Sequence, residues 1–168
     1  MGKDGNLSVF VLAMASAIGV SSDGTVVAGS SGGEAFRWDA VGGLTGLGYL
    51  TNSTNSGARA ISGNGSIIVG YSQIGSVDEA FVWDVANWMR SVKDVLLDDF
   101  GVTSMSSWGE TWADGISEDG CTIVGWGTNP DGNTEAWIAV IPEPAGLCIW
   151  VALIVVLSKR RRASNVQA

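Results

Sequence analysis

The chain has 168 residues, of which 46% are apolar and 24 are glycine, which excludes a disordered polyampholyte and suits one modest folded body with a tail. Residues 1–144 hold all 17 acidic residues and five of the nine cations, so their net charge of −12 argues against nucleic-acid binding. There is no histidine, the commonest general base and metal ligand, so zinc sites and triads are disfavoured and we expect no catalytic residue and no cofactor.

An apolar N-terminal segment, residues 1–16, has two interpretations. Its uncharged run ends in Ala15-Ser16-Ala17, a plausible cleavage motif for a signal peptidase, but the only preceding cation, Lys3, is offset by Asp4. Ala17 also belongs to the first repeat of the body. The segment is therefore either a weak signal peptide or the first strand of the body.

Three segments of the body resemble one another over eleven residues. Each contains an Asp-Gly or Asn-Gly pair, which tolerates the positive φ angles of tight hairpin turns. Val- and Ile-rich residues follow each pair and favour a strand. Each unit is therefore predicted to begin with a β-hairpin. The segments are residues 19–29, 60–70 and 115–125, with the pairs at 23–24, 64–65 and 119–120.

A second element follows each hairpin: residues 35–38, 80–83 and 136–139. In the first, the period of two places Phe36 and Trp38 on one face of a strand. A fourth strand is predicted from residues 44–50 in the first unit and 92–96 in the second, although residues 92–100 alternatively form a short helix. Four short strands per unit are typical of propeller blades, so we predict an all-β fold of three four-stranded blades, a partial or open propeller.

The pattern Ala-x-x-Ile-Ser-x-Asp-Gly-x-x-Val-Val-Gly-x-Ser, followed by Ala-Phe-x-Trp and Leu-Gly, resembles the HAF-type extracellular repeat over residues 17–139. The resemblance implies a propeller-like, extracellular body. The third unit departs from it, with Trp137 and Ala139 in place of Phe and Trp, and residues 87–112 are an insertion. Propellers close with about 4 to 8 blades, so three units predict a truncated or open array, or an assembly of several chains.

Two groups of polar side chains in the body are candidate sites. Four oxygen-bearing side chains alternate as in a calcium loop, but a hairpin loop with Asx turns explains the same pattern; we otherwise expect no metal site. Asp94, Asp98 and Asp99 are candidate acid/base carboxylates, but neighbouring side chains point apart, so a solvated face is the preferred interpretation. The calcium candidates are Asn129, Asp131, Asn133 and Glu135.

Four of the eight tryptophans, at positions 88, 108, 112 and 126, lie outside the repeated aromatic pair. They either form a stacking platform for a glycan or pack the blades together. Trp108 and Trp112 are the preferred candidates for glycan contact, because they lie in the irregular insertion.

The C-terminal region predicts a membrane segment. Residues 145–157 lack any charge and, as a helix, would be about 20 Å long, short of the roughly 30 Å hydrocarbon core. Ser158 and the stems of the following cations extend this length. We therefore predict a linker at 140–144, a transmembrane helix at 145–158 and a basic cytoplasmic tail at 159–168, with the body outside the cytoplasm.

The order of Pro-Glu-Pro, an apolar helix and a basic cluster resembles the PEP-CTERM sorting signal of bacterial surface proteins. Its residues here are Pro142, Glu143, Pro144, Lys159, Arg160, Arg161 and Arg162. The resemblance implies an exosortase-type membrane transpeptidase as partner, in envelopes that also export polysaccharide. An ordinary tail anchor and a buried core helix are the alternatives to a sorting signal.

We accordingly expect an exported, non-catalytic protein of the cell surface or extracellular matrix, inserted in the membrane before it reaches the surface or is secreted. A propeller-type carbohydrate-active enzyme, a glycan-binding module and a fragment of a longer repeat protein are the alternatives. The enzyme is disfavoured because the sequence has neither a nucleophile elbow nor convergent carboxylates.

Overall fold

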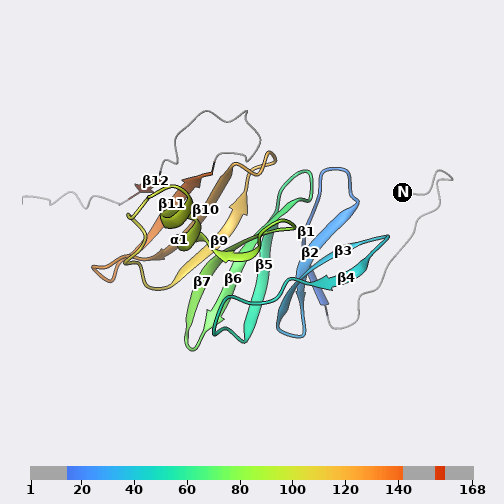
Figure 1. Cartoon of the computed structure of the whole chain (residues 1–168), viewed down its shortest axis with the longest axis horizontal. Coiled ribbons are helices and arrows are strands. Elements are labelled where there is room, and N and C mark those ends of the chain that lie inside the picture. The colour runs from blue at the N-terminus through green and yellow to red at the C-terminus, as the bar shows by residue number, and fades with distance from the viewer. Residues whose placement is uncertain (1–14, 142–153, 158–168) are drawn as a thin grey trace, which may run out of the picture.

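The computed structural model describes residues 15–141 and 154–157, and its strands form three four-stranded antiparallel sheets (Figure 1). Sheet 1 comprises β1 (Ala15–Val20), β2 (Val26–Ser31), β3 (Glu34–Asp39) and β4 (Gly43–Gly46). Sheet 2 comprises β5 (Asn55–Ile61), β6 (Ile67–Ile74), β7 (Val77–Asp84) and β8 (Trp88–Ser91). Sheet 3 comprises β9 (Thr111–Ile116), β10 (Thr122–Thr128), β11 (Thr134–Val140) and β12 (Ile154–Leu157). The all-β class with four strands per sheet is confirmed.

Each sheet has its strands in chain order, and the sheets follow one another along the long axis of the molecule with sheet 2 in the middle (Figure 1). In the second unit the fourth strand is Trp88–Ser91, so the prediction of a strand at 92–96 is wrong. Those residues instead begin a short helix, α1 (Val92–Asp94), which continues as a π-helical turn, η1 (Val95–Asp99). The alternative of a helix in this segment is confirmed, and Val95 and Leu96 point into the core.

The predicted transmembrane helix at 145–158 is not confirmed. Its residues Ile154–Leu157 form strand β12, which pairs antiparallel with β11, and the rest of that segment lies outside the described residues. Within the described ranges, no helix is long and apolar enough to cross a membrane. Residues 1–14 of the N-terminal segment, the Pro-Glu-Pro triplet and the basic tail also lie outside the described residues.

The three Asx-Gly turns are built by the same hydrogen bonds, in which a serine two residues before the Asx takes part. In sheet 2, Ser62 is fully buried, and its Oγ accepts a bond from Ile67 N at 3.0 Å and donates one to Asn64 Oδ1 at 2.9 Å. Asn64 Oδ1 also accepts from Ser66 N, and Gly65 has a φ of 70°. Equivalent bonds join Ser21 with Asp23 and Val26, and Ser117 with Asp119 and Thr122.

Neighbouring sheets pack through two unlike faces. The first face carries small or aliphatic side chains, and the second carries the aromatic element and the strand beside it. Between sheets 1 and 2 these are Ala28, Ala35 and Leu47 against Ala58, Ile68, Phe81 and Trp83. Between sheets 2 and 3 they are Val69, Ala80 and Val82 against Ala113, Ile123, Trp137 and Ala139. The departure of the third unit from Phe-x-Trp is therefore accommodated at equivalent buried positions.

Hydrogen bonds between the sheets repeat in the same way. Ala35 N donates to Ser56 Oγ of sheet 2 at 2.9 Å, and Ala80 N donates to Thr111 Oγ1 of sheet 3 at 3.1 Å. The turns are also joined, because the first and the second each donate a backbone N–H to a carbonyl of the next turn. These bonds run from Ser22 N to Gly63 O at 2.7 Å and from Gly63 N to Glu118 O at 2.9 Å.

Replacing Ser62 by alanine tests the role of the buried serine in the turn. The change leaves Ile67 N–H without its acceptor, so we expect the free energy of unfolding to fall by about 1–3 kcal/mol. The matched control is Ser66→Ala in the same turn, because Ser66 is exposed and its loss leaves the strand N–H bonded. Urea denaturation measures both variants, and equal destabilisation would contradict this account of the turn.

Candidate functional site

The two tryptophans predicted to contact a glycan lie in different surroundings. Trp108 is 6% exposed and packs in the core beside Val92 and Leu96, so it has little surface to offer a ligand. Trp112 is partly exposed and forms the centre of a group of aromatic side chains. Of the two, Trp112 is therefore the one placed to bind a ligand.

Three aromatic rings form a continuous surface, which we call the aromatic row: Trp126, Trp112 and Tyr71. The rings of Trp112 and Trp126 are stacked, with 5.6 Å between centroids and 9° between planes. Tyr71 lies on the other side, with its centroid 4.4 Å from that of Trp112 and a tilt of 34°. The Arg59 guanidinium is 4.8 Å from the Trp112 centroid and 5.3 Å from that of Tyr71. All three rings are partly exposed and Arg59 is exposed.

Strand register and a β-bulge create this arrangement. Trp112 and Trp126 are directly paired residues of β9 and β10, so their side chains lie on the same face. The register of β5 shifts between Ala58 and Ala60, which leaves Arg59 as the extra residue, and bulges of this kind re-aim a side chain. Gly57 faces the tyrosine ring, because a Cβ atom there would lie 2.7 Å from Tyr71.

Sequence reasoning named Trp112 and Trp126 as part of a possible platform but missed Tyr71 and Arg59. A signal for Tyr71 existed, because Val69-Gly70-Tyr71 and Val124-Gly125-Trp126 follow equivalent turns in the second and third units. Arg59 carried no comparable signal, because its position depends on the bulge in β5. Tyr71 in sheet 2 and Trp126 in sheet 3 thus occupy the same position of the repeat. Trp112, on the first strand of sheet 3, lies between them and completes the row.

The chemistry of the row suits a ligand with a flat apolar face. Aromatic rings offer a broad surface with a negative quadrupole, and Arg59 adds a cation with several N–H donors. Trp112 Nε1 is buried without an acceptor among the described residues, so holding the ring in this place has an energetic cost.

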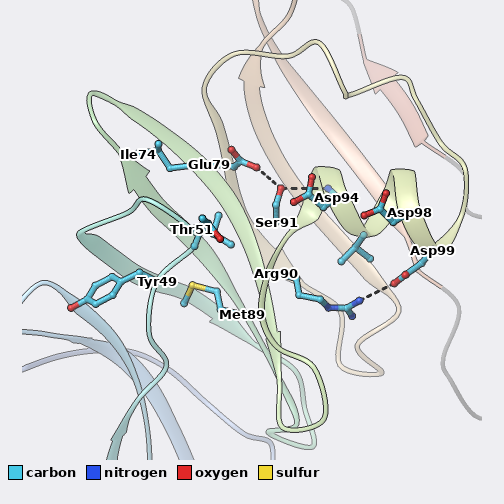
Figure 2. A pocket seen from close by; sticks show the side chains of 12 residues that line it. Tyr49, Thr51, Ile74, Glu79, Met89, Arg90, Ser91, Asp94, Asp98 and Asp99 are labelled. Carbon is cyan, nitrogen blue, oxygen red and sulfur yellow. Dashed lines mark hydrogen bonds and ion pairs between the residues drawn. The ribbon is translucent and has the colours of Figure 1, made fainter.

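A second feature is an acidic pocket of about 520 Å³ between the loop after β4 and the helix (Figure 2). Asp94, Asp98 and Asp99 line it together with Glu79, and all three aspartates are exposed, which agrees with the solvated face that the sequence favoured. Figure 2 shows Asp94 and Asp98 on the same side of the helical segment and Glu79 approaching from β7. The other residues that line the acidic pocket include Tyr49, Thr51, Met89, Arg90 and Ser91.

Ion pairs engage two of the four carboxylates in the acidic pocket, Asp99 and Glu79. Arg90 Nη1 lies 2.9 Å from Asp99 Oδ2, Lys93 Nζ lies 3.6 Å from Glu79 Oε2, and Ser91 donates a hydrogen bond to Glu79. Burial, followed by the nearby charges of Glu79 and Asp98, raises the pKa of Asp94, while Lys93 opposes the rise. The pocket therefore gathers carboxylates that are mostly exposed, and the residues that line it do not place a matched acid and base on a common target.

The predicted calcium loop connects β10 and β11. Asn129 Oδ1 accepts hydrogen bonds from Asp131 N at 3.0 Å and Asn133 N at 2.9 Å, as in an Asx-turn hairpin loop. Across residues 15–141, no cluster of three or more acidic, cysteine or histidine side chains is placed to hold a metal ion. The calcium prediction, including Glu135, therefore gains no support from the geometry. The sorting-signal residues, at 142–144 and 159–162, lie outside the described residues.

The three repeated turns meet at a shallow cavity of about 480 Å³, lined by Ser22, Asp23, Gly63, Asn64, Glu118 and Asp119. Hydrogen bonds from the Ser21 hydroxyl and then from Thr25 lower the pKa of Asp23 from 3.8 to about 2. Bonds from the Ser117 hydroxyl and Cys121 N lower the pKa of Asp119 in the same way. In the second turn Asn64 occupies the same position and does not titrate.

Replacing Asp23 and Asp119 together by asparagine tests these two carboxylates. A carboxylate with a lowered pKa stabilises the fold above its ordinary pKa of 3.8, and this contribution is lost as the pH falls toward 2. We therefore expect the stability advantage of the wild type over the double variant to shrink as the pH falls through this window. Urea midpoints at a series of pH values measure it, and an advantage that does not change with pH would contradict the assignment.

Comparison with known proteins identifies the fold alone. The crystal structure of TolB from Acinetobacter baumannii matches with a TM-score of 0.54 and 14% sequence identity. The match covers 83% of this chain and 31% of that chain, so this chain spans about a third of the length of its structural neighbour. No family model matches the sequence, and no curated protein matches it.

Proposed function

We propose that this protein is an exported, non-catalytic, propeller-like repeat protein whose aromatic row binds polysaccharide at the cell surface or in the extracellular matrix. The observation that supports this function best is the stack of Trp126 on Trp112, continued by Tyr71. In this proposal a sugar chain lies along the exposed parts of the stacked rings, which supply a large apolar contact area.

The charge around the row favours an anionic polysaccharide. Arg59 is exposed and lies within 4.8 Å of the Trp112 ring centroid, so a carboxylate or sulfate on the sugar would meet a guanidinium beside the rings. The body as a whole is strongly acidic and repels polyanions at long range. Arg59 therefore attracts an anionic group only at short range, beside the rings. We expect each site to bind weakly, and we expect added salt to strengthen binding because it screens the long-range repulsion from the acidic body.

Export in this proposal depends on the C-terminal sorting signal. The proposed partner is an exosortase-type transpeptidase that recognises Pro142 and Pro144, with residues 145–158 in the membrane and Arg160 in the cytoplasm. Ile154–Leu157 pair with β11 in the structure, so these four residues would have to leave sheet 3 to enter the bilayer. The exchange would break the pairing of these four residues with Ala136–Ala139.

Truncating the row tests the binding function. We expect Trp112→Ala and Trp126→Ala each to weaken binding to an acidic uronate polysaccharide by on the order of tenfold, about 1.4 kcal/mol, because each removes a stacked ring. The control is Trp88→Ala, because Trp88 is 63% exposed and lies outside the row. Affinity electrophoresis in gels containing the polysaccharide measures all three variants. Equal retardation of the Trp112 and Trp88 variants would contradict the proposal.

Altering the sorting signal tests export independently of binding. Substituting Pro142 and Pro144 by alanine, or Arg160, Arg161 and Arg162 by serine, is expected to leave the body in the membrane fraction and absent from the surface. Cell fractionation and surface protease accessibility measure the outcome. The control is the Trp112→Ala variant, which should reach the surface normally. Unchanged surface delivery of both sorting variants would refute this route of export.

A further inference from the structure

The outer face of sheet 3 repeats a face that is covered in sheets 1 and 2. In sheet 2 this face consists of Val69, Ala80 and Val82, which are 0%, 1% and 6% exposed because sheet 3 packs on them. The equivalent residues of sheet 3 are Val124, Ala136 and Ile138. Val124 is 40% exposed and Ala136 is exposed, so the same kind of surface stands open at this end of the chain.

The opposite end of the array, in sheet 1, repeats the complementary face. In sheets 2 and 3 this face includes Ala58 and Ile68, and Ala113 and Ile123, all at most 2% exposed. The equivalent residues of sheet 1 are Ala17, which is exposed, and Val27, which is partly exposed, whereas the aromatic member of this face, Phe36, is 1% exposed. The open part of the face therefore lies on β1 and β2. Ile18 and Val20 on β1 are 50% and 57% exposed.

The series of hydrogen bonds between the turns leaves one backbone donor at one end of the series and one backbone acceptor at the other. Ser22 and Gly63 each donate a backbone N–H to the turn of the following sheet. Within the described residues, the equivalent N–H of Glu118 has no acceptor, and the equivalent carbonyl of Ser22 has no donor. One end of the chain therefore offers a donor and the other end an acceptor, in the order that the two internal contacts use.

We propose that two copies of this chain associate head to tail, with sheet 3 of each packed on sheet 1 of the other, to close a ring of six sheets. The occupant of each open face is a second copy because the chain itself carries both halves of a contact that it already forms twice internally. Two copies satisfy both ends at once, through two identical interfaces related by a two-fold axis. The three sheets that residues 15–141 and 154–157 form are fewer than the roughly 4 to 8 with which propellers close, whereas six fall in that range.

This association is independent of the proposed polysaccharide binding. Tyr71 in sheet 2 is the equivalent of Trp126 in sheet 3. Tyr71 stays partly exposed although sheet 3 packs on sheet 2. Trp126 would therefore keep exposed surface in the ring. One interface bond would be missing, because Ala15 stands where Ser56 and Thr111 bond to the neighbouring sheet. The new interfaces consequently depend on apolar packing more than the internal ones do.

The test is the mass of the full chain, measured by light scattering after size-exclusion chromatography in a mild detergent that keeps its apolar C-terminal segment from associating. We expect a protein mass twice that of the chain. Val124→Glu and Ala136→Glu place a carboxylate in the contact and are expected to give monomers. The control is Val85→Glu, because Val85 is 76% exposed although both faces of its sheet are covered, and this variant should remain a dimer.

A mixing experiment separates this contact from any other mode of dimerisation. Val27→Lys is expected to be monomeric by itself, because its lysine disrupts the sheet 1 side. Mixed with Val124→Glu, it should form a heterodimer, in which one interface pairs the two substitutions and the other is unaltered. A wild-type monomer at every concentration tested, an open-ended polymer, a dimer that persists in Val124→Glu, or failure of the mixture to dimerise would each overturn the proposal.

Discussion

The contact between unlike faces of neighbouring sheets is the interaction on which the rest of the structure depends. A four-stranded sheet of short strands cannot bury both of its faces alone, and each sheet here buries at least one against its neighbour. Small residues on one face leave room for Phe81 or Trp137 on the other. Each such aromatic side chain is fully buried, and its truncation in a core typically costs about 3–5 kcal/mol. The repeat is therefore a unit of packing as well as a unit of sequence.

Local features of the sequence were sufficient to predict the class of fold. The Asx-Gly turns and the Phe-x-Trp strands are set by residues a few positions apart, and both were predicted correctly. The serine of each turn was part of the repeated pattern, but its dual role, as acceptor from the strand and donor to the Asx, is a property of the folded turn. The segment after β8 was ambiguous because its apolar residues fit both a strand and a helix. Packing of Val95 and Leu96 into the core decides for the helix.

The candidate site was less predictable because its parts come from three strands in two sheets. Trp112 and Trp126 were recognisable as tryptophans outside the repeated pair, but only the register of β9 and β10 makes them a stack. Arg59 reaches the rings because a bulge displaces it from the ladder. The acidic pocket was missed for the same reason, since Glu79 approaches the helical carboxylates only through the packing of β7. The strand formed by Ile154–Leu157 pairs at a sheet edge, an outcome that hydropathy alone does not distinguish from a membrane segment.

Amide hydrogen exchange at Ala35 and Ala80 tests most directly the claim that repeated contacts between the sheets hold the protein together. Each of these N–H groups bonds to a hydroxyl of the following sheet, so it exchanges only when the two sheets separate. The account predicts that both amides exchange as slowly as that of Val69 in the central sheet, through unfolding of the whole body. Rapid exchange at Ala35 and Ala80 while Val69 stays protected would show that the sheets separate freely, and would contradict the account.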